Sequence, residues 1–223
     1  PFVMSLKIWR SYKNTIEKAG HTFVPVTPNI VDSIWSSRPS QPRNDIYPLS
    51  IKFTGKDSTF KLREIRNELK KIGSNKDSNS VVLLLSMLDE IAWLTNLRGS
   101  DIEYNPVFES YAAVFSDRAI CFCHQPEVNL SQYCPDWEFR PYSDYKSFLT
   151  KLATQENLKV LLDPSSTTMG TLMAFSKSQV LENESPVILK KAVKNSSEIS
   201  AAKTAHKMAG AGLVRSLIKL QKF

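Results

Sequence analysis

The chain lacks any long apolar segment. None of its apolar runs approaches the roughly 20 residues that a membrane-spanning helix needs, so we expect no membrane partner. The start, Pro1-Phe2-Val3-Met4 followed by Lys7 and Arg10, contains no small residues of the cleavage-site type and predicts no signal peptide. These two absences favour a cytoplasmic protein.

Cysteine and histidine are also scarce, with three residues of each. Cys121, Cys123 and Cys134 are an odd number at uneven spacing, which indicates a reducing compartment rather than a disulfide framework. Cys121, Cys123 and His124 could supply zinc ligands. Because residues two apart in a strand share one face, we favour two buried thiols with His124 at the end of the strand.

Catalytic motifs are missing as well. The sequence has no Gly-x-Ser-x-Gly elbow, His-Glu-x-x-His pair, phosphate loop or dinucleotide fingerprint, so we predict no catalytic residue, metal ligand or cofactor within it. Its net charge of +7 permits a polyanionic partner. The basic residues do not gather into one patch, since Lys70-Lys71 and Lys190-Lys191 are isolated doublets, and we expect no nucleic-acid partner.

The 223 residues suffice for one large domain, or for one domain with parts of its neighbours. Apolar residues at helical spacing predict a helix over 4–19, and Pro25 limits Phe23–Val26 to an edge strand. Val31 to Trp35 suits one more helical turn. Residues 36–48 contain three prolines, which predicts an extended linker and a domain boundary.

The following block alternates helix and strand, which predicts an α/β domain with a mixed sheet flanked by helices. A continuous apolar run, as at Val81–Leu85, is typical of a strand covered on both faces. The predicted elements are a helix from Asp57 or Ser58 to Gly73, a strand over 81–85, a helix over 89–94, a hairpin of 111–115 and 119–123, a helix capped by Ser143, and a strand over 158–162.

A long helix is predicted over 197–220, because Asn195 and Glu198 have the spacing of a capping box. We expect its apolar face to pack on its own domain or on a second copy of the chain. His206 lies near this face, and we expect it to pack or to form a hydrogen bond. The face consists of Ala202, Ala205, Ala209, Leu213, Leu217 and Leu220.

One stretch resembles a known family. The run Leu-Asp-Glu-Ile-Ala-Trp-Leu at 88–94, Asn-Leu-Arg-Gly-Ser-Asp at 96–101 and Asn-Pro-Val-Phe at 105–108 resembles the middle domain of aminopeptidase P, the three-domain Xaa-Pro aminopeptidase. Residues 186–195, with Glu198, Ala205 and His206, resemble the start of that family's catalytic domain. The match is looser after His206, where Met208-Ala209-Gly210 replaces the family's usual acidic residue.

The resemblance implies a creatinase amino-terminal-domain type of fold. It assigns residues 1–35 to the end of the family's first domain, 36–48 to a linker, 49–185 to the middle domain and 186–223 to the start of the catalytic domain. The implied parent is a metal-dependent enzyme that removes an N-terminal residue preceding proline, with two divalent ions, usually manganese. Its five metal ligands would lie outside this chain, which we therefore expect to be inactive alone.

The resemblance also implies a homodimer and a substrate-entrance loop. Arg98, Asp101 and Tyr104 are the entrance candidates, because the corresponding loop of creatinase-fold enzymes approaches the mouth of the active site. In the alternative interpretation, Arg98 pairs with Asp89 or Asp101 and pins the loop, while Trp93 belongs to the core. A rival function is a non-catalytic creatinase-fold interaction module, similar to histone-chaperone subunits, that binds a protein partner.

Overall fold

The centre of the molecule is a six-stranded mixed sheet with strand order β6-β5-β4-β2-β7-β8. The computed structural model describes residues 4–26, 29–74, 80–127, 129–155 and 157–221. β4 runs antiparallel to β2 and β5, whereas the β2–β7, β7–β8 and β5–β6 pairs are parallel. The strands are β2 (Val81–Leu85), β4 (Ser110–Val114), β5 (Ala119–Cys123), β6 (Trp137–Pro141), β7 (Lys159–Leu162) and β8 (Val180–Glu182).

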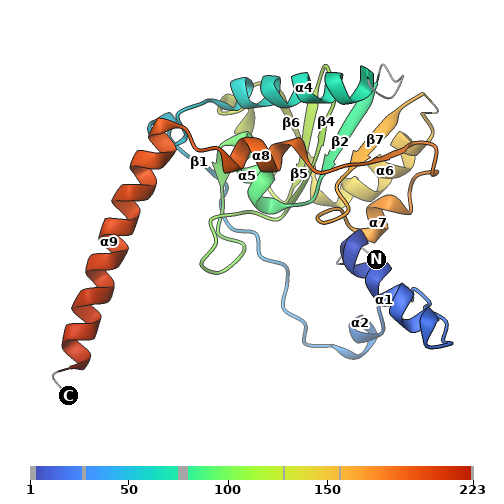
Figure 1. Cartoon of the computed structure of the whole chain (residues 1–223), viewed down its shortest axis with the longest axis horizontal. Helices are drawn as coiled ribbons and strands as arrows, with labels where there is room; N and C mark the ends of the chain where they lie inside the picture. Colours follow the sequence, from blue (N-terminus) through green and yellow to red (C-terminus); the bar gives the residue numbers. More distant parts are fainter. Residues whose placement is uncertain (1–3, 27–28, 75–79, 128, 156, 222–223) are drawn as a thin grey trace.

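Helices cover both faces of this sheet (Figure 1), as the unbroken apolar run of β2 predicts. Val81, Leu83 and Leu85 face one side, and Val82 and Leu84 face the other. The first face packs on α4 (Ser58–Ser74), α5 (Leu88–Thr95) and α8 (Pro186–Ala192), and the second packs on α6 (Tyr145–Ala153) and α7 (Met169–Leu172).

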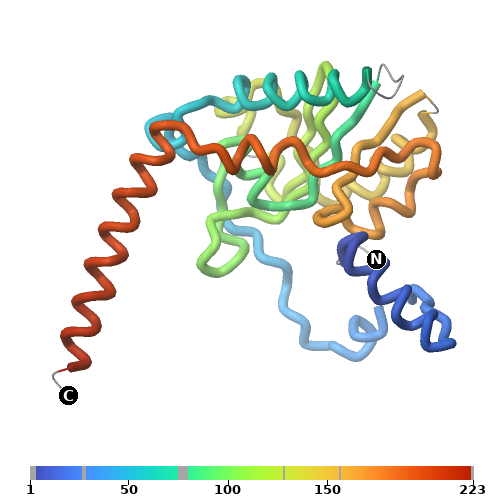
Figure 2. The backbone as a smooth tube through the Cα atoms, viewed as in Figure 1, coloured from blue at the N-terminus to red at the C-terminus, as the bar shows by residue number. Residues whose placement is uncertain are grey.

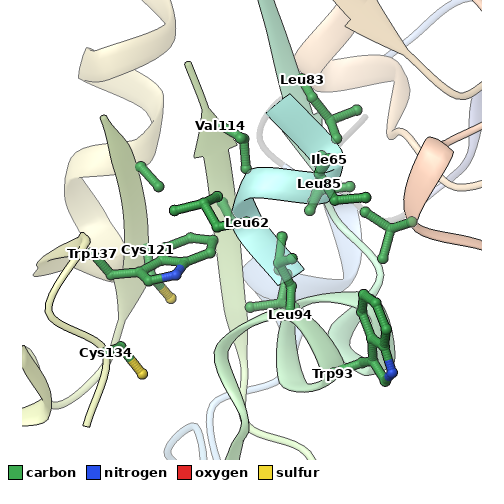
Figure 3. Packing of buried hydrophobic residues seen from close by; sticks show 14 of the residues in the cluster. Leu62, Ile65, Leu83, Leu85, Trp93, Leu94, Val114, Cys121, Cys134 and Trp137 are labelled. Carbon is green, nitrogen blue, oxygen red and sulfur yellow. The ribbon is translucent and has the colours of Figure 1, made fainter. Parts of the chain in front are cut away.

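The core between α4, α5 and the sheet is mainly aliphatic, with tryptophans at its margins (Figure 3). Leu62 and Ile65 of α4 are fully buried against Leu83 and Leu85. Trp93 lies at the edge of this cluster with its ring nitrogen directed away from the aliphatic side chains. The indole is therefore placed to contact another part of the chain.

Smaller elements and outlying helices complete the chain. Strands β1 (Tyr47–Pro48) and β3 (Leu97–Arg98) form a separate antiparallel pair. Among the helices in the described residues, none is both long and apolar enough to cross a membrane. The remaining elements are α1 (Leu6–Lys18), α2 (Ile30–Ile34), α3 (Ile51–Thr54), η1 (Leu130–Gln132), η2 (Tyr142–Asp144) and α9 (Ser196–Leu220).

Helix α9 extends away from the domain (Figure 2), so the first of the two expected packings, on its own domain, is wrong, and packing on a second copy stays a prediction. None of the α9 side chains is buried, and Leu213, Leu217 and Leu220 are 62%, 51% and 70% exposed. His206 is exposed too, so of its two expected roles, packing or hydrogen bonding, it does not pack within the described part of this chain. The helix contacts the domain near α3, at the end fixed by its capping box, and that contact directs it outward.

Two local predictions also fail. Residues 23–26 form no strand, because no neighbouring strand lies beside them to pair with. Ser143 does not cap α6; it lies within η2, and the chain continues directly into the helix at Tyr145. The predicted α4 helix, the β4–β5 hairpin and the β2 and β7 strands are confirmed.

Candidate functional site

A left-handed turn at the end of α5 directs the segment that follows, residues 97–108, which we call the Arg98 loop. The turn residue is Asn96, with a φ of 59°, a conformation that asparagine tolerates better than most residues. Its side-chain amide donates to the Lys56 carbonyl at 2.9 Å. The Leu97 amide donates to the Thr95 hydroxyl at 3.2 Å, so both sides of the turn are fixed.

Arg98 lies half-buried where the loop leaves α5, and its guanidinium bonds inside the domain. Nη1 donates to the carbonyl oxygens of Ala92 at 2.5 Å and Leu97 at 2.8 Å. Burial lowers the pKa of Arg98 from its ordinary value, but an arginine remains charged at neutral pH. The expected pairing with Asp89 or Asp101 is wrong, because both carboxylates have other partners.

Asp101 ties the loop to two other segments. Its Oδ1 accepts from the Asn44 amide at 3.0 Å, and its Oδ2 accepts from the Glu109 amide at 2.8 Å. The two ends of the loop pack closely against each other, since a Cβ at Gly99 would lie 2.7 Å from the Phe108 Cβ. Asp101 thus connects the linker, the loop and the start of β4.

Tyr104 lies at the tip of the Arg98 loop and is 98% exposed. Its φ of 60° is uncommon for a residue with a side chain, and a bridge between Ile102 and Asn105 closes the tip around it. The structure therefore separates the three candidates: Arg98 faces α5, Asp101 faces the linker, and Tyr104 projects into solvent.

A buried lysine beside Arg98 escaped the sequence analysis. Lys61 of α4 is 1% exposed, and its Nζ donates to the Trp93 carbonyl at 2.9 Å and to Asn96 Oδ1 at 2.6 Å. Nζ also lies 4.4 Å from the centre of the Trp93 ring. Desolvation lowers the pKa of Lys61 to about 8, and the Glu198 carboxylate partly opposes this. The sequence did contain a signal for this burial. Lys61 precedes the buried Ile65 by four residues, which places both on the same face of the helix.

Glu198, in the first turn of α9, joins that helix to α5. The Trp93 Nε1 donates to Glu198 Oε1 at 3.1 Å. The other oxygen, Oε2, accepts from the Asn195 amide at 2.9 Å and completes the capping box. Trp93, which belongs to the stretch that resembles the family, thus holds α9 at the point where this helix leaves the domain.

The preceding turn of α5 holds α8 in the same way. Asp89 forms an ion pair with Lys191 near the end of α8. Glu90 is 2% exposed, and its Oε2 accepts from the hydroxyl of Ser185, the N-cap of α8, at 2.6 Å. Burial raises the pKa of Glu90 to about 7, with the hydroxyl bond opposing the rise and the neighbouring carboxylate of Asp89 adding to it.

We call this set of contacts the α5 joint. It connects Lys61, Asp89, Glu90 and Trp93 to Ser185, Lys191 and Glu198.

The turn after α3 completes the support of α9. Asn195 donates from its side-chain amide to the Thr54 carbonyl at 2.8 Å. Gly55 has a φ of 65°, and a Cβ there would lie 2.5 Å from Asn195 Oδ1. Only glycine fits this close approach.

The described residues contain no group of three or more histidine, cysteine or acidic side chains placed to hold a metal ion. The thiols of Cys121 and Cys123 are buried, and His124 bonds to Glu109 at 3.0 Å instead. Chemically, the site therefore offers hydrogen-bond donors and carboxylates that bind and orient other parts of a protein.

A mixed six-stranded sheet flanked by helices is the α/β fold of creatinase amino-terminal domains. The family described as the creatinase/prolidase N-terminal domain matches residues 37–198, and the chain belongs to this family. The matched range contains the whole α5 joint.

Similar proteins are Xaa-Pro aminopeptidases. The chain is 36% identical to Xaa-Pro aminopeptidase 1 of Dictyostelium discoideum over 87% of its own length and 31% of that protein. It is 32% identical to Xaa-Pro aminopeptidase 2 of Sus scrofa over its whole length and 34% of that protein. The chain thus spans about a third of the curated relatives that it matches.

A solved structure agrees. The chain superposes on a Caenorhabditis elegans X-prolyl aminopeptidase, described as a cytosolic enzyme with a di-nuclear active site, with a TM-score of 0.83 and 25% identity. The superposition covers 99% of this chain and 36% of that one. The likeness therefore includes the outlying helices as well as the domain.

Proposed function

We propose that the chain is the middle, non-metal-binding part of a metal-dependent Xaa-Pro aminopeptidase, an enzyme that removes an N-terminal residue preceding proline. In this proposal residues 1–35 end a first domain, 36–48 are a linker, 49–185 form the middle domain and 186–223 begin the catalytic domain. The observation that carries it is the 36% identity to such an enzyme over 87% of the chain.

The α5 joint supports this division. Its buried contacts fasten Glu198 and Lys191, which belong to the segment assigned to the catalytic domain. The joint would set the direction in which the catalytic domain follows. The exposed apolar face of α9 is then available to that domain, because none of the α9 side chains is buried against the described residues.

The residues that the structure describes do not fit the family's pair of metal ions. The described part holds no suitable cluster of donors, so no step of hydrolysis is assigned to it. In the parent enzyme, the two divalent ions, usually manganese, would be held by the catalytic domain. The nematode relative's di-nuclear active site and cytosolic description support this proposal and a cytoplasmic location. A homodimer is proposed from the resemblance to the family alone.

An aminopeptidase assay on the full-length protein and on residues 1–223 tests the proposal. With manganese and an Arg-Pro-Pro peptide, we expect the full-length protein to release arginine and residues 1–223 to release none. Turnover by residues 1–223 above a buffer control would contradict the assignment, as would a full-length protein without activity.

Within that enzyme, we propose that the Arg98 loop shapes the substrate entrance, with Asp101 fixing the loop and Arg98 or Tyr104 facing the peptide. Tyr104 favours this role, because an aromatic side chain 98% exposed at a tied loop tip is available to a partner. Arg98 already bonds to two carbonyls, which gives it a structural role too.

Arg98→Ala and Tyr104→Ala separate the two roles. Removing Arg98 takes its hydrogen bonds from the carbonyls of Ala92 and Leu97, and we expect the free energy of unfolding of residues 1–223 to fall by about 1–3 kcal/mol. Removing Tyr104 should leave that free energy within about 0.5 kcal/mol of the wild type, because it is exposed. A lower kcat/KM of full-length Tyr104→Ala would support the entrance, and unchanged kinetics in both folded variants would refute it.

A further inference from the structure

A cavity of about 690 Å³ lies at one end of the sheet, away from the α5 joint. It opens where the parallel strands β5 and β6 end, next to the linker, and crevices outside the carboxyl ends of strands are where α/β sheets bind ligands. The lining residues come from the linker, the β4 strand, the β5–β6 loop and the segment after β6. They are Gln41, Arg43, Tyr111, Cys123, His124, Pro126, Glu127, Pro141, Tyr142, Ser143, Tyr145 and Lys146.

One wall is a column of four aromatic rings. The rings of His124 and Tyr142 have centroids 4.4 Å apart, those of Tyr142 and Tyr111 are 5.2 Å apart, and those of Tyr111 and Tyr145 are 3.9 Å apart and nearly parallel. Each ring covers the face of the next, so the inner rings present mainly their electropositive edges. Burial raises the pKa of Tyr111 and Tyr142, which keeps both hydroxyls neutral.

Two acidic groups lie beside the cavity: Glu127 is an exposed part of its lining, and Glu109, next to the column, is already engaged. Glu109 Oε2 lies 3.0 Å from His124 Nε2, and the Glu109 amide donates to Asp101. The His124 side chain is only 9% exposed, so this bond holds the imidazole in the wall. Glu109 therefore does not neutralise a positive charge at the mouth of the cavity.

The mouth carries an arginine that has no described acidic partner. Within the described residues no carboxylate lies within ion-pair distance of Arg43, although the main chain around it is fixed. The Arg43 carbonyl accepts from Gln125 Nε2 at 3.1 Å, and the adjacent Asn44 is bonded to Asp101 and Ser100. An arginine presented in this way suits a carboxylate, which its planar guanidinium binds with two parallel hydrogen bonds.

We propose that this cavity binds a carboxylate attached to a flat apolar ring, directly or through a short linker, with Arg43 binding the carboxylate and the face of the ring lying against Pro141 and the edge of Tyr142. An aromatic ring packs favourably with its face on the electropositive edge of another ring, and Arg43 at the mouth requires a ligand with acceptor oxygens. Two sources share this chemistry: a free aryl carboxylate and an aromatic carboxyl-terminal residue of a peptide. The site shares no residue with the α5 joint, although Asp101 of the Arg98 loop bonds to the Asn44 and Glu109 amides beside it, and its test is a binding measurement that does not depend on peptidase activity.

Titration of residues 1–223 with three probes tests the site: benzoate, N-acetylphenylalanine and its uncharged amide. We expect saturable binding of a carboxylate probe with a dissociation constant of about 1 mM or tighter, and binding of the amide that is weaker by at least about tenfold. Binding of benzoate indicates a free aryl carboxylate. Binding of N-acetylphenylalanine alone indicates a peptide terminus.

The arginine is tested by a matched pair of variants. Arg43→Gln should weaken carboxylate binding by about tenfold, which is about 1.4 kcal/mol. Arg118→Gln, the same change on the hairpin at the opposite end of β5, should leave binding unchanged. Arg43 makes no described side-chain contact with the core, and Arg118 is about half exposed and covers only the ring of Phe115, so we expect both variants to fold.

A readout on the wild-type chain does not depend on these variants. With only three histidines, the NMR signals of His124 are separable, and they should shift on binding while those of His21 and His206 do not. Absence of saturation with both carboxylates would overturn the proposal. So would Arg43→Gln binding as tightly as the wild type, or a saturating shift confined to His21 or His206.

Discussion

The two outlying helices, α1 and α9, are attached to the domain by different physics. α1 is held by main-chain bonds and apolar anchors: the Leu6 amide donates to the Thr167 carbonyl at 2.9 Å, and the side chains of Leu6 and Trp9 are buried. α9 buries no side chain and is held at its first turn by the Glu198 carboxylate. One attachment depends on area removed from water, and the other depends on oriented polar groups.

The difference matters because the two kinds of contact respond differently to conditions. Apolar burial is non-directional and insensitive to pH. Hydrogen bonds to buried charges fix direction, and they change when a group titrates. The α5 joint contains two such groups, Lys61 and Glu90, whose pKa values are shifted toward neutrality. α9 is thus attached by the directional contact, and the two shifted groups lie in the joint that supports it.

The largest expected effect is a pH dependence of stability that comes from the α5 joint. The pKa of Glu90 rises from 4.5 to about 7 on folding, so between these values the folded state binds the extra proton and stability falls as pH rises. The pKa of Lys61 falls from 10.5 to about 8, so from pH 8 upward the unfolded state binds more protons and stability rises again. We call these two ranges the acid limb and the alkaline limb of the stability curve. Across each limb the free energy of unfolding changes by about 3 kcal/mol.

Urea denaturation across pH measures these limbs as differences between variants. Glu90→Gln, which keeps an oxygen as acceptor for Ser185, should remove the acid limb, and Lys61→Met should remove the alkaline one. Glu68→Gln is the control, because Glu68 bonds to surface lysines and its pKa is lowered. An acid limb that persists in Glu90→Gln would show that the joint does not titrate.

The sequence predicted the interior of the sheet better than its edges. Val81–Leu85 and the β4–β5 hairpin were found because long apolar runs and a three-residue turn are strong local signals. The edge strands β6 and β8 were missed. β6 ends at Pro141 and has polar residues in its middle, and β8 has only three residues, so each depends on its neighbour for pairing.

The candidate site was predicted as a stretch of sequence but not as a set of contacts. The resemblance selected α5 and the Arg98 loop, and the capping box of α9 was read correctly from Asn195 and Glu198. The partners of Trp93 and Glu90 lie about a hundred residues further along the chain. No local pattern encodes contacts of that separation, and the exposure of α9 depends on them.

A second, smaller effect concerns direction rather than total stability. Trp93→Phe removes the donor to Glu198, and Trp137→Phe removes a similar donor to the Ser58 hydroxyl, 3.0 Å away in the same core. Each change should lower the free energy of unfolding by about 1–2 kcal/mol. The Ile199 amide bonds to the Asn195 carbonyl, and its hydrogen exchange should be about tenfold faster in Trp93→Phe than in Trp137→Phe. Equal exchange in both variants would mean that Trp93 does not fix α9.

The smallest effect is expected at the ion pair that joins α1 to the sheet in the described part of the chain. Arg10 and Glu182 form two hydrogen bonds, but their side chains are 48% and 37% exposed, so water screens the attraction. A double-mutant cycle with Arg10→Ala and Glu182→Ala should give a coupling of about 0.5 kcal/mol, and about 1 M salt should remove most of it. Arg10 lowers the pKa of Glu182, so this small stabilisation is present at neutral pH and is lost as pH falls and the carboxyl takes up a proton. A salt-resistant coupling above about 2 kcal/mol would place α1 and α9 in the same class of attachment, and the contrast between them would fail.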